Sequence, residues 1–546
     1  MTIRTNQIEW PGRSVMIKIL PYRCLCVCLP VMFLFSCREP LKETSRKDIQ
    51  ILPRPQQITF YEGTFVMAAG TSIKAGDELM ARAAQLRNYL SPATGFELPV
   101  NKRKAGGNTI ELRLLGTLSD LGKEGYRLEI TEKKVLITAC HSQGIYWGIQ
   151  TLRQLLPVQI LRGAVVDQVA WELPCIKIVD KPRFAWRGLM IDYSRTFWSK
   201  HVTKKYIDAI SYFKLNKLHM HLTDDQGWRL EIAKYPALTE IASKFDTVYH
   251  EPEERQGFYS REDIRELVNY ARARGIELIP EIEMPGHTSE VFAAYPGLSC
   301  TGDTSSIHPF FEGPGIHEEI FCAGKAETFE FLDNVLQEVA ELFPSGTIHI
   351  GGDEAPKAGW KACPDCQRVI RENGLKDEDE LQGWFIGRIE NTVKSLGKEL
   401  IGWDEIMEGG LSETSTVMFW RANMENEVLR ALDHGNGNKV ILTPTSHCYF
   451  DYTYERIPTE KVYSLGTVID QFEKTVPGQV LGVQGNFWSH IDRTEPGMDR
   501  QIFPRLLALA EVGWTEDSEQ DWHDFSVRLE HHYQSLDLLD IYFMNK

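Results

Sequence analysis

Residues 260–283, SREDIRELVNYARARGIELIPEIE, contain one complete helix-and-strand unit. Ser260 and Asp263 have the spacing of a capping box, which marks the start of a helix. The apolar residues that follow have the spacing of one helix face: Ile264, Leu267, Val268 and Ala271. Gly275 stands where a left-handed residue ends a helix, and an apolar run begins directly after it. The stretch therefore predicts a helix between Ser260 and Gly275 that leads into a buried strand.

Apolar runs of this kind recur along the C-terminal two thirds of the chain, separated by segments long enough for helices. The eight runs are residues 188–192, 217–223, 277–283, 347–352, 399–403, 416–420, 439–443 and 479–486. Near-continuous apolar runs are typical of parallel strands that are buried on both faces. Eight such strands alternating with helices favour a (β/α)8 TIM barrel over residues 183–546, rather than an open doubly wound sheet.

The region ahead of the barrel has a different pattern. Residues 126–130 and 134–138 alternate between apolar and polar side chains, as strands with one buried face do. Helical stretches are expected around residues 78–90 and 144–156. We therefore expect a small α+β domain over residues 46–182.

The first residues, 1–37, have the pattern of a leader with a lipoprotein-type signal peptide. Lys18 and Arg23 precede an apolar run over residues 25–35, and Cys37 follows it. The run is too short to span a bilayer as a helix. We expect Cys37 to be lipidated and the protein to lie in the cell envelope, in the periplasm or on the outer-membrane surface, held to a membrane only through that anchor. The alternative is an ordinary secretory signal with a chance cysteine.

The net charge and the cysteine spacing indicate which partners and cofactors to expect. The 546 residues include 60 Lys and Arg against 76 Asp and Glu, a net charge of −16, which disfavours nucleic-acid binding. Cys363 and Cys366 form an isolated CxxC pair. A zinc site needs four ligands and no second such pair follows nearby, so a local disulfide or free thiols are favoured, and Cys300 and Cys322 could also pair. No metal or other cofactor is expected, and no oligomeric state is predicted.

Polar and aromatic residues follow nearly every predicted strand. In a TIM barrel the active site lies at the C-terminal ends of the strands, so these residues are the candidates for function. They are Arg195, Asp224, His287, Asp353, Glu354, Trp403, Trp420, Tyr449, Asp451, Trp488 and His490. Carboxylates and tryptophan rings gathered at one mouth suit a sugar, because flat apolar rings pack on sugar faces.

Asp353 and Glu354 are the strongest candidates for catalysis. They follow an apolar run and two glycines, and two adjacent carboxylates repel, so the pKa of one should be raised. Such a pair suits protonation of a glycosidic oxygen. The alternative is that the two carboxylates only occupy the first turn of a helix, where acidic residues are favoured.

Other candidate residues have alternative roles. His219, His221 and Asp224 compete as metal ligands, but they lie along one strand without an HExxH motif. His287 could instead bond the backbone, and Arg195 could be a structural ion-pair partner.

Several motifs together resemble the β-N-acetylhexosaminidases of glycoside hydrolase family 20. They are DKPRFAWRG (180–188), HMHLTDDQGWR (219–229), EMPGHT (283–288), HIGGDE (349–354) and GWDE (402–405), with ILPRP (51–55) and EG (62–63) in the preceding domain. The resemblance extends from about residue 50 to the C-terminus. It implies exo-acting release of terminal β-linked GlcNAc or GalNAc from glycans. It also implies that the substrate's 2-acetamido oxygen is the nucleophile, giving an oxazolinium intermediate and net retention.

The resemblance also implies a role for each site residue. Glu354 is the general acid and then the base, and Asp353 orients the acetamide and stabilises its positive charge. His287 and Asp224 form a hydrogen-bonded pair behind Glu354. The remaining residues hold the sugar: Trp403, Trp420 and Trp488 enclose it, Tyr449 bonds the acetamido carbonyl, and Arg195 and Asp451 hold ring hydroxyls.

The sequence departs from the family pattern at His490. The family usually has Glu there, two residues after the last tryptophan, holding the hydroxyls at carbons 4 and 6. Imidazole donates hydrogen bonds and can carry positive charge, so a 6-sulfated sugar could be accepted. The alternatives are a hydrolase of disaccharide units or other charged glycans, and a non-catalytic surface glycan-binding lipoprotein on a degenerate barrel.

Overall fold

The computed structural model describes residues 49–102, 108–245, 250–304, 307, 315–435 and 437–545. The leader expected at residues 1–37, with Cys37, lies outside these residues. Within the described part of the chain, no helix combines the length and the apolar character that a bilayer span requires.

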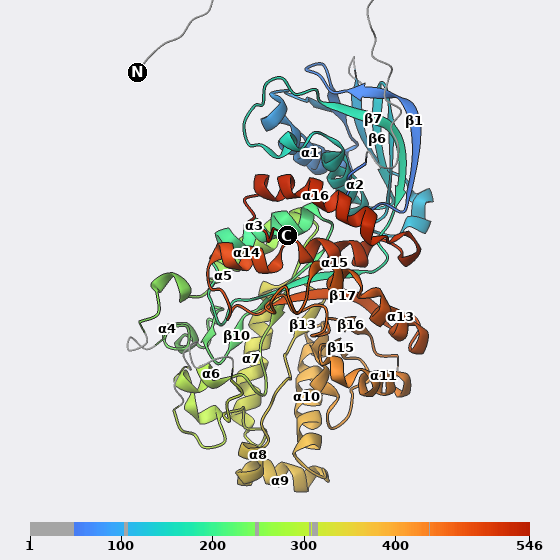
Figure 1. Cartoon of the computed structure of the whole chain (residues 1–546). Helices are drawn as coiled ribbons and strands as arrows, with labels where there is room; N and C mark the ends of the chain where they lie inside the picture. Colours follow the sequence, from blue (N-terminus) through green and yellow to red (C-terminus); the bar gives the residue numbers. More distant parts are fainter. Residues whose placement is uncertain are drawn as a thin grey trace, which may run out of the picture. The chain divides into compact units, whose positions relative to one another are not determined.

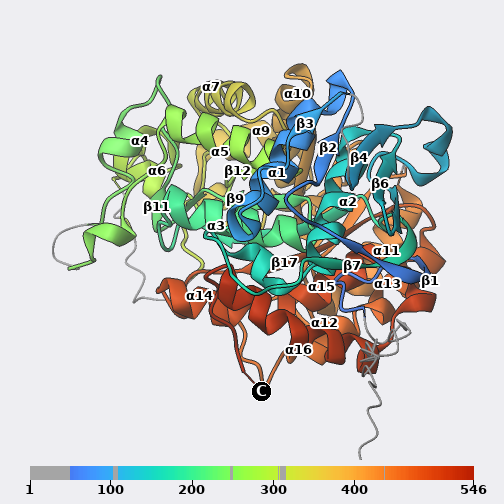
Figure 2. The ribbon, with the colours of Figure 1, turned by 90° about the horizontal axis from the view of Figure 1, so that it is seen from above.

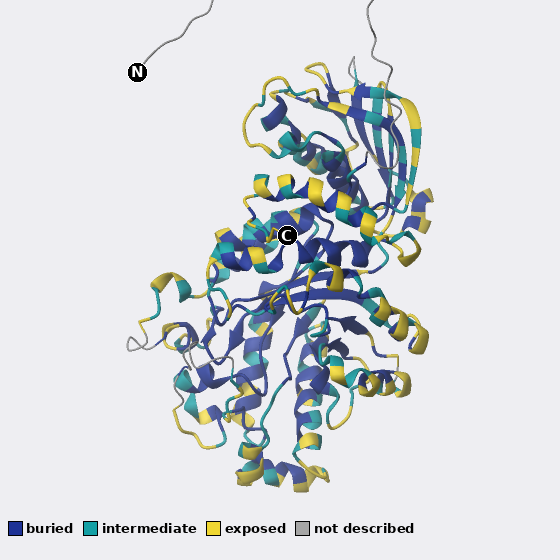
Figure 3. Ribbon diagram, in the orientation of Figure 1, coloured by how far each residue is buried: buried dark blue, intermediate teal, exposed yellow. Residues whose placement is uncertain are grey.

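Eight parallel strands form a closed barrel, as the sequence predicts (Figure 1). In chain order they are β8 (Trp186–Asp192), β9 (Lys217–His221), β12 (Glu277–Glu281), β13 (Thr347–His349), β14 (Glu399–Trp403), β15 (Thr416–Phe419), β16 (Val440–Leu442) and β17 (Val480–Phe487). The last strand pairs with the first, with Gly485 opposite Leu189. Each predicted apolar run overlaps one of these strands, and every residue of β8 is buried. The barrel strands are mostly dark blue in the view coloured by burial (Figure 3).

Helices surround the strands (Figure 2). They are α3 (Lys200–Tyr212), α4 (Ala237–Glu240), α5 (Arg261–Ala273), α6 (Ser289–Ala294), α7 (Ala326–Leu342), α8 (Ala358–Ala362), α9 (Pro364–Asn373), α10 (Glu378–Ser395), α11 (Glu425–His434), α12 (Thr459–Tyr463), α13 (Gly466–Thr475), α14 (Glu495–Ile502), α15 (Arg505–Trp514) and α16 (Trp522–Leu538). The expected helix is α5: Ser260 and Asp263 form the capping box, and Gly275 has a φ of +71°.

One connection differs from the expected alternation of strands and helices. Between β14 and β15, where every residue is described, the chain forms a 3₁₀ turn at Asp404–Met407 and no α-helix. The connection comprises only residues 404–415, which is at the lower limit of the roughly 10–12 residues that a crossover with a helix needs. The two acidic residues of this turn instead form hydrogen bonds with Trp420, the residue directly after β15. Asp404 accepts from the backbone N–H of Trp420, and Glu405 accepts from its indole N–H.

The α+β domain is a seven-stranded sheet with two helices on one face (Figure 1). Its elements are β1 (Gln57–Val66), β2 (Ser72–Lys74), α1 (Met80–Thr94), β3 (Val100–Asn101), β4 (Thr109–Leu114), β5 (Tyr126–Thr131), β6 (Lys134–Ala139), α2 (Ser142–Leu155) and β7 (Glu172–Asp180). The sheet order is β1-β7-β5-β6-β4-β2-β3. The predicted strands and helices of this domain are therefore confirmed.

Buried polar contacts join this domain to the start of the barrel. Asp180 accepts hydrogen bonds from Tyr126 (2.6 Å), Lys214 (3.0 Å) and Trp514 (2.9 Å). Burial lowers the pKa of Lys214. Arg187, the second residue of β8, pairs with Glu124 of the domain at 2.5 Å. These contacts lie at the N-terminal ends of β8 and β9, so the opposite mouth of the barrel is left for the site.

Candidate active site

All eight strands deliver a candidate residue to the same mouth of the barrel. Most of these residues come directly after a strand or in the loop that follows it. Arg195 follows β8, Asp224 lies in β10 (Thr223–Asp224) beyond β9, His287 follows β12, Asp353 and Glu354 follow β13, Trp403 ends β14, Trp420 follows β15, Tyr449 and Asp451 follow β16, and Trp488 and His490 follow β17. An isolated bridge pairs Tyr449 with Asn486 of β17, which brings the long β16 loop back to the barrel.

Two glycines and a strained residue place the carboxylate pair. Gly351 and Gly352 have φ angles of +66° and +94°. A Cβ on Gly351 would lie 1.6 Å from a carboxylate oxygen of Glu283, so a side chain does not fit there. Glu354 itself has a φ of +46°, a conformation that costs a non-glycine residue about 1–3 kcal/mol. Such strain is concentrated at active sites, and here it turns both carboxylates toward the mouth.

Burial distinguishes the two carboxylates. The side chain of Asp353 is 11% exposed, whereas that of Glu354 is 35% exposed. Burial raises the pKa of Asp353 to about 7, and the negative charge of Glu354 adds to the effect against the opposing charge of His287. One raised pKa is present, as the adjacent carboxylates predict, but it belongs to Asp353 and not to the residue that was expected to donate the proton. Glu354 is the more exposed of the two carboxylates.

His287 connects Glu354 to two buried aspartates. Its Nε2 lies 3.3 Å from a carboxylate oxygen of Glu354, and its Nδ1 lies 3.1 Å from Asp225 and 3.3 Å from Asp224. Burial alone would lower the pKa of His287, but the two aspartates hold it well above its usual value. The raised pKa favours the cationic form of His287, which faces Glu354. The expected pairing of His287 with Asp224 is present, and Asp225 is a second partner.

Arg195 is fixed by ion pairs beneath the aromatic rings. It is 5% exposed and lies 2.6 Å from Asp224 and 3.5 Å from Asp192, and its Nε donates to Gln226 at 2.7 Å. Its guanidinium lies 5.1 Å from the ring centre of Trp488. The geometry agrees with the structural ion-pair role that the sequence left open.

Four aromatic rings form a continuous wall. The ring centres of Trp403 and Trp488 are 5.9 Å apart, those of Trp488 and Tyr449 are 6.4 Å apart, and those of Tyr449 and Trp420 are 6.0 Å apart. Burial, with Asp451 and Asp353 nearby, holds the pKa of Tyr449 well above its usual value, so its hydroxyl keeps its proton. The site therefore offers apolar ring faces and a hydroxyl donor side by side.

Three buried polar atoms at this wall have no hydrogen-bond partner among the described residues. They are Oδ1 of Asp353, Oδ1 of Asp451 and Nε1 of Trp403. Leaving a buried polar atom unpaired costs about 1–3 kcal/mol, and such atoms in native proteins call for an explanation. Two unpaired acceptors and one unpaired donor near the same wall of rings fit a ligand that carries hydroxyl and amide groups.

His490 is half-buried and lies near Arg195 and Asp192. Burial lowers its pKa to about 4, and the positive charge of Arg195 contributes. His490 is therefore neutral at neutral pH. The positive charge that an imidazole can carry would appear on His490 only below about pH 4.

Comparison with known families matches both parts of the chain. Residues 184–517 match the model described as glycosyl hydrolase family 20, catalytic domain, and residues 48–181 match the one described as glycosyl hydrolase family 20, domain 2. The chain belongs to glycosyl hydrolase family 20. It is therefore a glycoside hydrolase, and β-N-acetylhexosaminidase activity is the function that its relatives support.

The relatives cover nearly the whole chain. A beta-hexosaminidase of Porphyromonas gingivalis is 38% identical over 94% of this chain and 67% of its own length. The family 20 β-N-acetylhexosaminidase of Streptomyces coelicolor has a TM-score of 0.79 at 31% identity, covering 91% of this chain and 98% of that one. An exo-β-N-acetylglucosaminidase of Vibrio harveyi, solved with N-acetylglucosamine, has a TM-score of 0.79 at 31% identity over 91% of this chain and 78% of that one.

A buried network lies under the family 20 site; His219 and His221 were considered from the sequence as metal ligands, whereas Glu281 and His349 were not among the candidates. Glu281 lies 2.5 Å from His221, 3.0 Å from His219 and 2.8 Å from His349. Glu281 and Asp224 raise the pKa of His221 to about 10 despite its burial. These donors could hold a metal by type, but they bond one another here. The polar residues at alternate positions of β9, His219 and His221, and the buried Glu281 at the end of β12 are the signal that could have identified the network.

Proposed function

We propose that this family 20 enzyme is an exo-acting, retaining β-N-acetylhexosaminidase that removes terminal β-linked GlcNAc or GalNAc from glycans. The observation that carries the proposal is the pairing of a reachable carboxylate, Glu354, with a buried one, Asp353, whose Oδ1 is unpaired beside the aromatic wall. Two carboxylates in such different surroundings suit two different roles. The bound monosaccharide and the exo action of the Vibrio harveyi relative support the substrate class.

In the first step Glu354 gives its proton to the glycosidic oxygen, and the bond from that oxygen to the anomeric carbon breaks. The acetamido oxygen of the substrate forms a new bond to the same carbon, which gives an oxazolinium ion and retains configuration after the second step. Asp353 accepts the acetamide N–H, and its negative charge stabilises the positive charge that develops on the ring. Tyr449, which keeps its proton, donates to the acetamido oxygen.

In the second step Glu354 takes a proton from water, and the water oxygen bonds to the anomeric carbon as the oxazolinium ring opens. Cationic His287 holds Glu354 in position through both steps. Trp403, Trp420 and Trp488 exclude water around the acetamide, and Asp451 accepts from a ring hydroxyl. Arg195 contributes by holding Asp224 and supporting Trp488.

His490 favours acceptance of a sugar with a sulfate at carbon 6. The Glu that the family usually has at this position would repel the anion, whereas a neutral imidazole donates a hydrogen bond to it. Because burial lowers the pKa of His490 to about 4, the preference rests on hydrogen bonding and loss of repulsion rather than on a positive charge.

We expect the wild type to hydrolyse aryl glycosides of GlcNAc, GalNAc and 6-sulfated GlcNAc. His490→Glu should lower the ratio of kcat/KM for sulfated over unsulfated substrate by about tenfold or more, since a like-charge clash in a partly desolvated pocket costs a few kcal/mol. The ratio for the wild type should stay flat between about pH 5 and pH 8, because His490 remains neutral there.

His490→Gln is the matched control, because it keeps a neutral hydrogen-bond donor and should keep most of the ratio. The sulfate proposal fails if the wild type does not cleave the sulfated substrate, or if His490→Glu leaves the ratio unchanged. Lack of activity on every N-acetylhexosaminide would overturn the proposed function itself.

We also propose that the chain is a lipoprotein of the cell envelope, anchored through Cys37, in the periplasm or on the outer-membrane surface. The signal-peptide pattern over residues 1–37 supports this location, and so does a glycan substrate that occurs outside the cytoplasm.

A further inference from the structure

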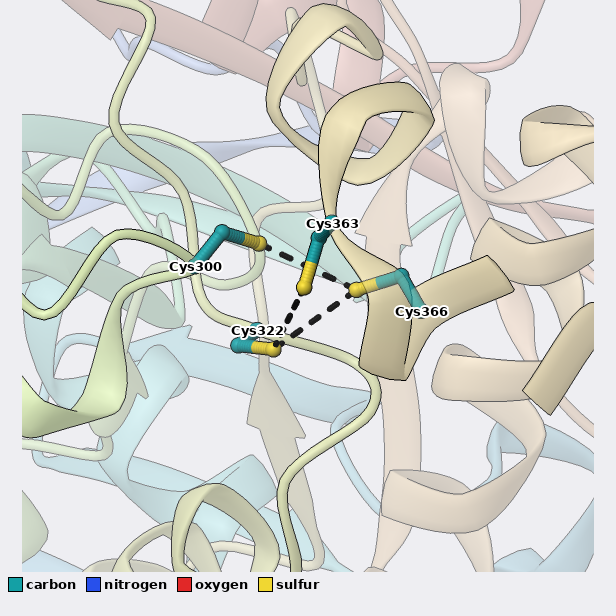
Figure 4. Close-up of side chains that lie close together, drawn as sticks. All are labelled: Cys300, Cys322, Cys363 and Cys366. Atoms are coloured by element: carbon teal, nitrogen blue, oxygen red, sulfur yellow. Dashed lines mark hydrogen bonds between the residues drawn. The ribbon is translucent and has the colours of Figure 1, made fainter. Parts of the chain in front are cut away.

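Four cysteines from three separate segments meet beside the active-site loops (Figure 4). Cys300 and Cys322 lie in the connection between β12 and α7. Cys363 is the N-cap of α9, and Cys366 lies in the first turn of that helix. Their sulfur atoms point toward one another, and all four lie within 4.8 Å of each other. Cys322, Cys363 and Cys366 are buried, and Cys300 is partly exposed.

The spacing of the sulfurs is compatible with four ligands around one metal ion. The sulfur of Cys322 is 3.6 Å from that of Cys366 and 3.7 Å from that of Cys363, and the sulfurs of Cys300 and Cys366 are 3.8 Å apart. Four thiolates bound tetrahedrally to zinc at about 2.3 Å have sulfur–sulfur edges of about 3.8 Å. A disulfide needs about 2.05 Å, and it would single out pairs of cysteines. Here Cys322 and Cys366 each have two neighbours at nearly equal distances.

The backbone around the cluster is held independently of the sulfurs. The N–H of Cys322 donates to the carbonyl of Leu298, and the indole of Trp360 donates to the carbonyl of Phe321 at 2.8 Å. A Cβ on Gly324 would lie 2.3 Å from the backbone carbon of Asp365, so the two cysteine segments approach as closely as glycine allows. The four thiols are therefore preorganised.

We propose that Cys300, Cys322, Cys363 and Cys366 bind a structural zinc ion. Four cysteine ligands close the coordination shell and leave no open position, which is the arrangement of structural rather than catalytic sites. Tetrahedral sulfur sites hold zinc or iron, and zinc fits a hydrolase because the reaction moves no electrons. The spacing along the chain does not reveal the site, because only Cys363 and Cys366 form a local CxxC pair and the other two ligands come from distant positions.

The ion would tie together the two loops that carry the catalytic acid and its histidine. Cys300 and Cys322 belong to the β12–α7 connection, which also carries His287, and Cys363 and Cys366 belong to the β13–α10 connection, which also carries Glu354. Closing two long loops at a shared point removes conformational freedom from both. We infer that the zinc ion fixes the approach of His287 to Glu354.

The test is the metal content of the purified full-length chain. We expect about one zinc ion per chain by inductively coupled plasma mass spectrometry after extensive dialysis, and a thiolate-to-metal charge-transfer band when cobalt replaces zinc. Cys366→Ser and Cys300→Ser should each weaken zinc binding by more than about 100-fold, because losing even an outer-shell partner of a metal ligand costs about 10–100-fold. Cys140→Ser, in the α+β domain, is the matched control and should keep the ion.

Cobalt spectra and metal content of the unmodified chain decide the proposal even if a cysteine variant fails to fold. The proposal is wrong if the wild type purifies without metal and peptide mapping of the unreduced protein finds disulfides among these four cysteines. It is also wrong if Cys366→Ser or Cys300→Ser keeps the zinc, or if Cys140→Ser loses it. None of these outcomes depends on which substrate the enzyme cleaves.

Discussion

Glu354→Gln should lower kcat/KM on a natural glycan by about 10²–10⁴-fold, the usual contribution of a general acid. A glutamine at this position has no proton to give to the glycosidic oxygen. An aryl glycoside with a good leaving group needs that proton less, so its first step should slow much less. Steady-state kinetics on a disaccharide and on an activated aryl N-acetylglucosaminide, assayed in parallel, measure the difference.

Glu372→Gln is the control for Glu354→Gln, because Glu372 is an exposed glutamate on α9 away from the site. It should leave both activities unchanged. Equal small losses on the two substrates with Glu354→Gln would show that another group is the acid. An unchanged melting temperature would show that the variant is folded.

Asp353→Asn should lower kcat by about 10²–10³-fold on both kinds of substrate. This residue acts on the acetamide rather than on the leaving group, so a better leaving group does not rescue the variant. The pH profile gives a second readout. Burial raises the pKa of Asp353 to about 7, so kcat/KM of the wild type should fall as the pH drops below about 7 and Asp353 takes up a proton. Asparagine does not titrate, so the variant should lose this acid limb.

A thiazoline mimic of the oxazolinium ion is the companion probe for Asp353. It should inhibit the wild type tightly and Asp353→Asn weakly, because it resembles the intermediate that the carboxylate stabilises. The matched aryl β-glucoside, which lacks the acetamide, should not be cleaved by either protein. Efficient cleavage of that glucoside, or a trapped covalent adduct on the enzyme, contradicts the assigned role.

The sequence predicts most of this fold because the barrel strands are buried on both faces. Near-continuous apolar runs such as residues 188–192 therefore mark strands directly, and the polar residues after them mark the mouth of the site. Helix α5 was predictable because its cap, its apolar face and its final glycine are all local signals. The missing helix between β14 and β15 was not predictable from the number of strands. Its connection is short, and Asp404 and Glu405 bond Trp420.

Properties that depend on tertiary surroundings could not be predicted from the sequence. Adjacent carboxylates suggested one raised pKa, but only burial assigns it to Asp353. The sequence does not show whether His490 is charged, because its low pKa results from burial in the folded protein. The four cysteines approach one another through folding of the β12 and β13 loops, and the one local CxxC pair gives no sign of the other two.

The proposed mechanism depends on the substrate's own acetamide acting as the nucleophile. The most direct test is kcat/KM for a series of aryl glycosides whose N-acetyl group carries zero, one, two or three fluorine atoms. Fluorine withdraws electrons from the acetamido oxygen and weakens it as a nucleophile, while the leaving group and the ring hydroxyls stay the same. We predict a steep, continuous fall in kcat/KM with each added fluorine. Rates that do not depend on fluorination would contradict the account, because a nucleophile supplied by the protein would be nearly insensitive to the acyl group.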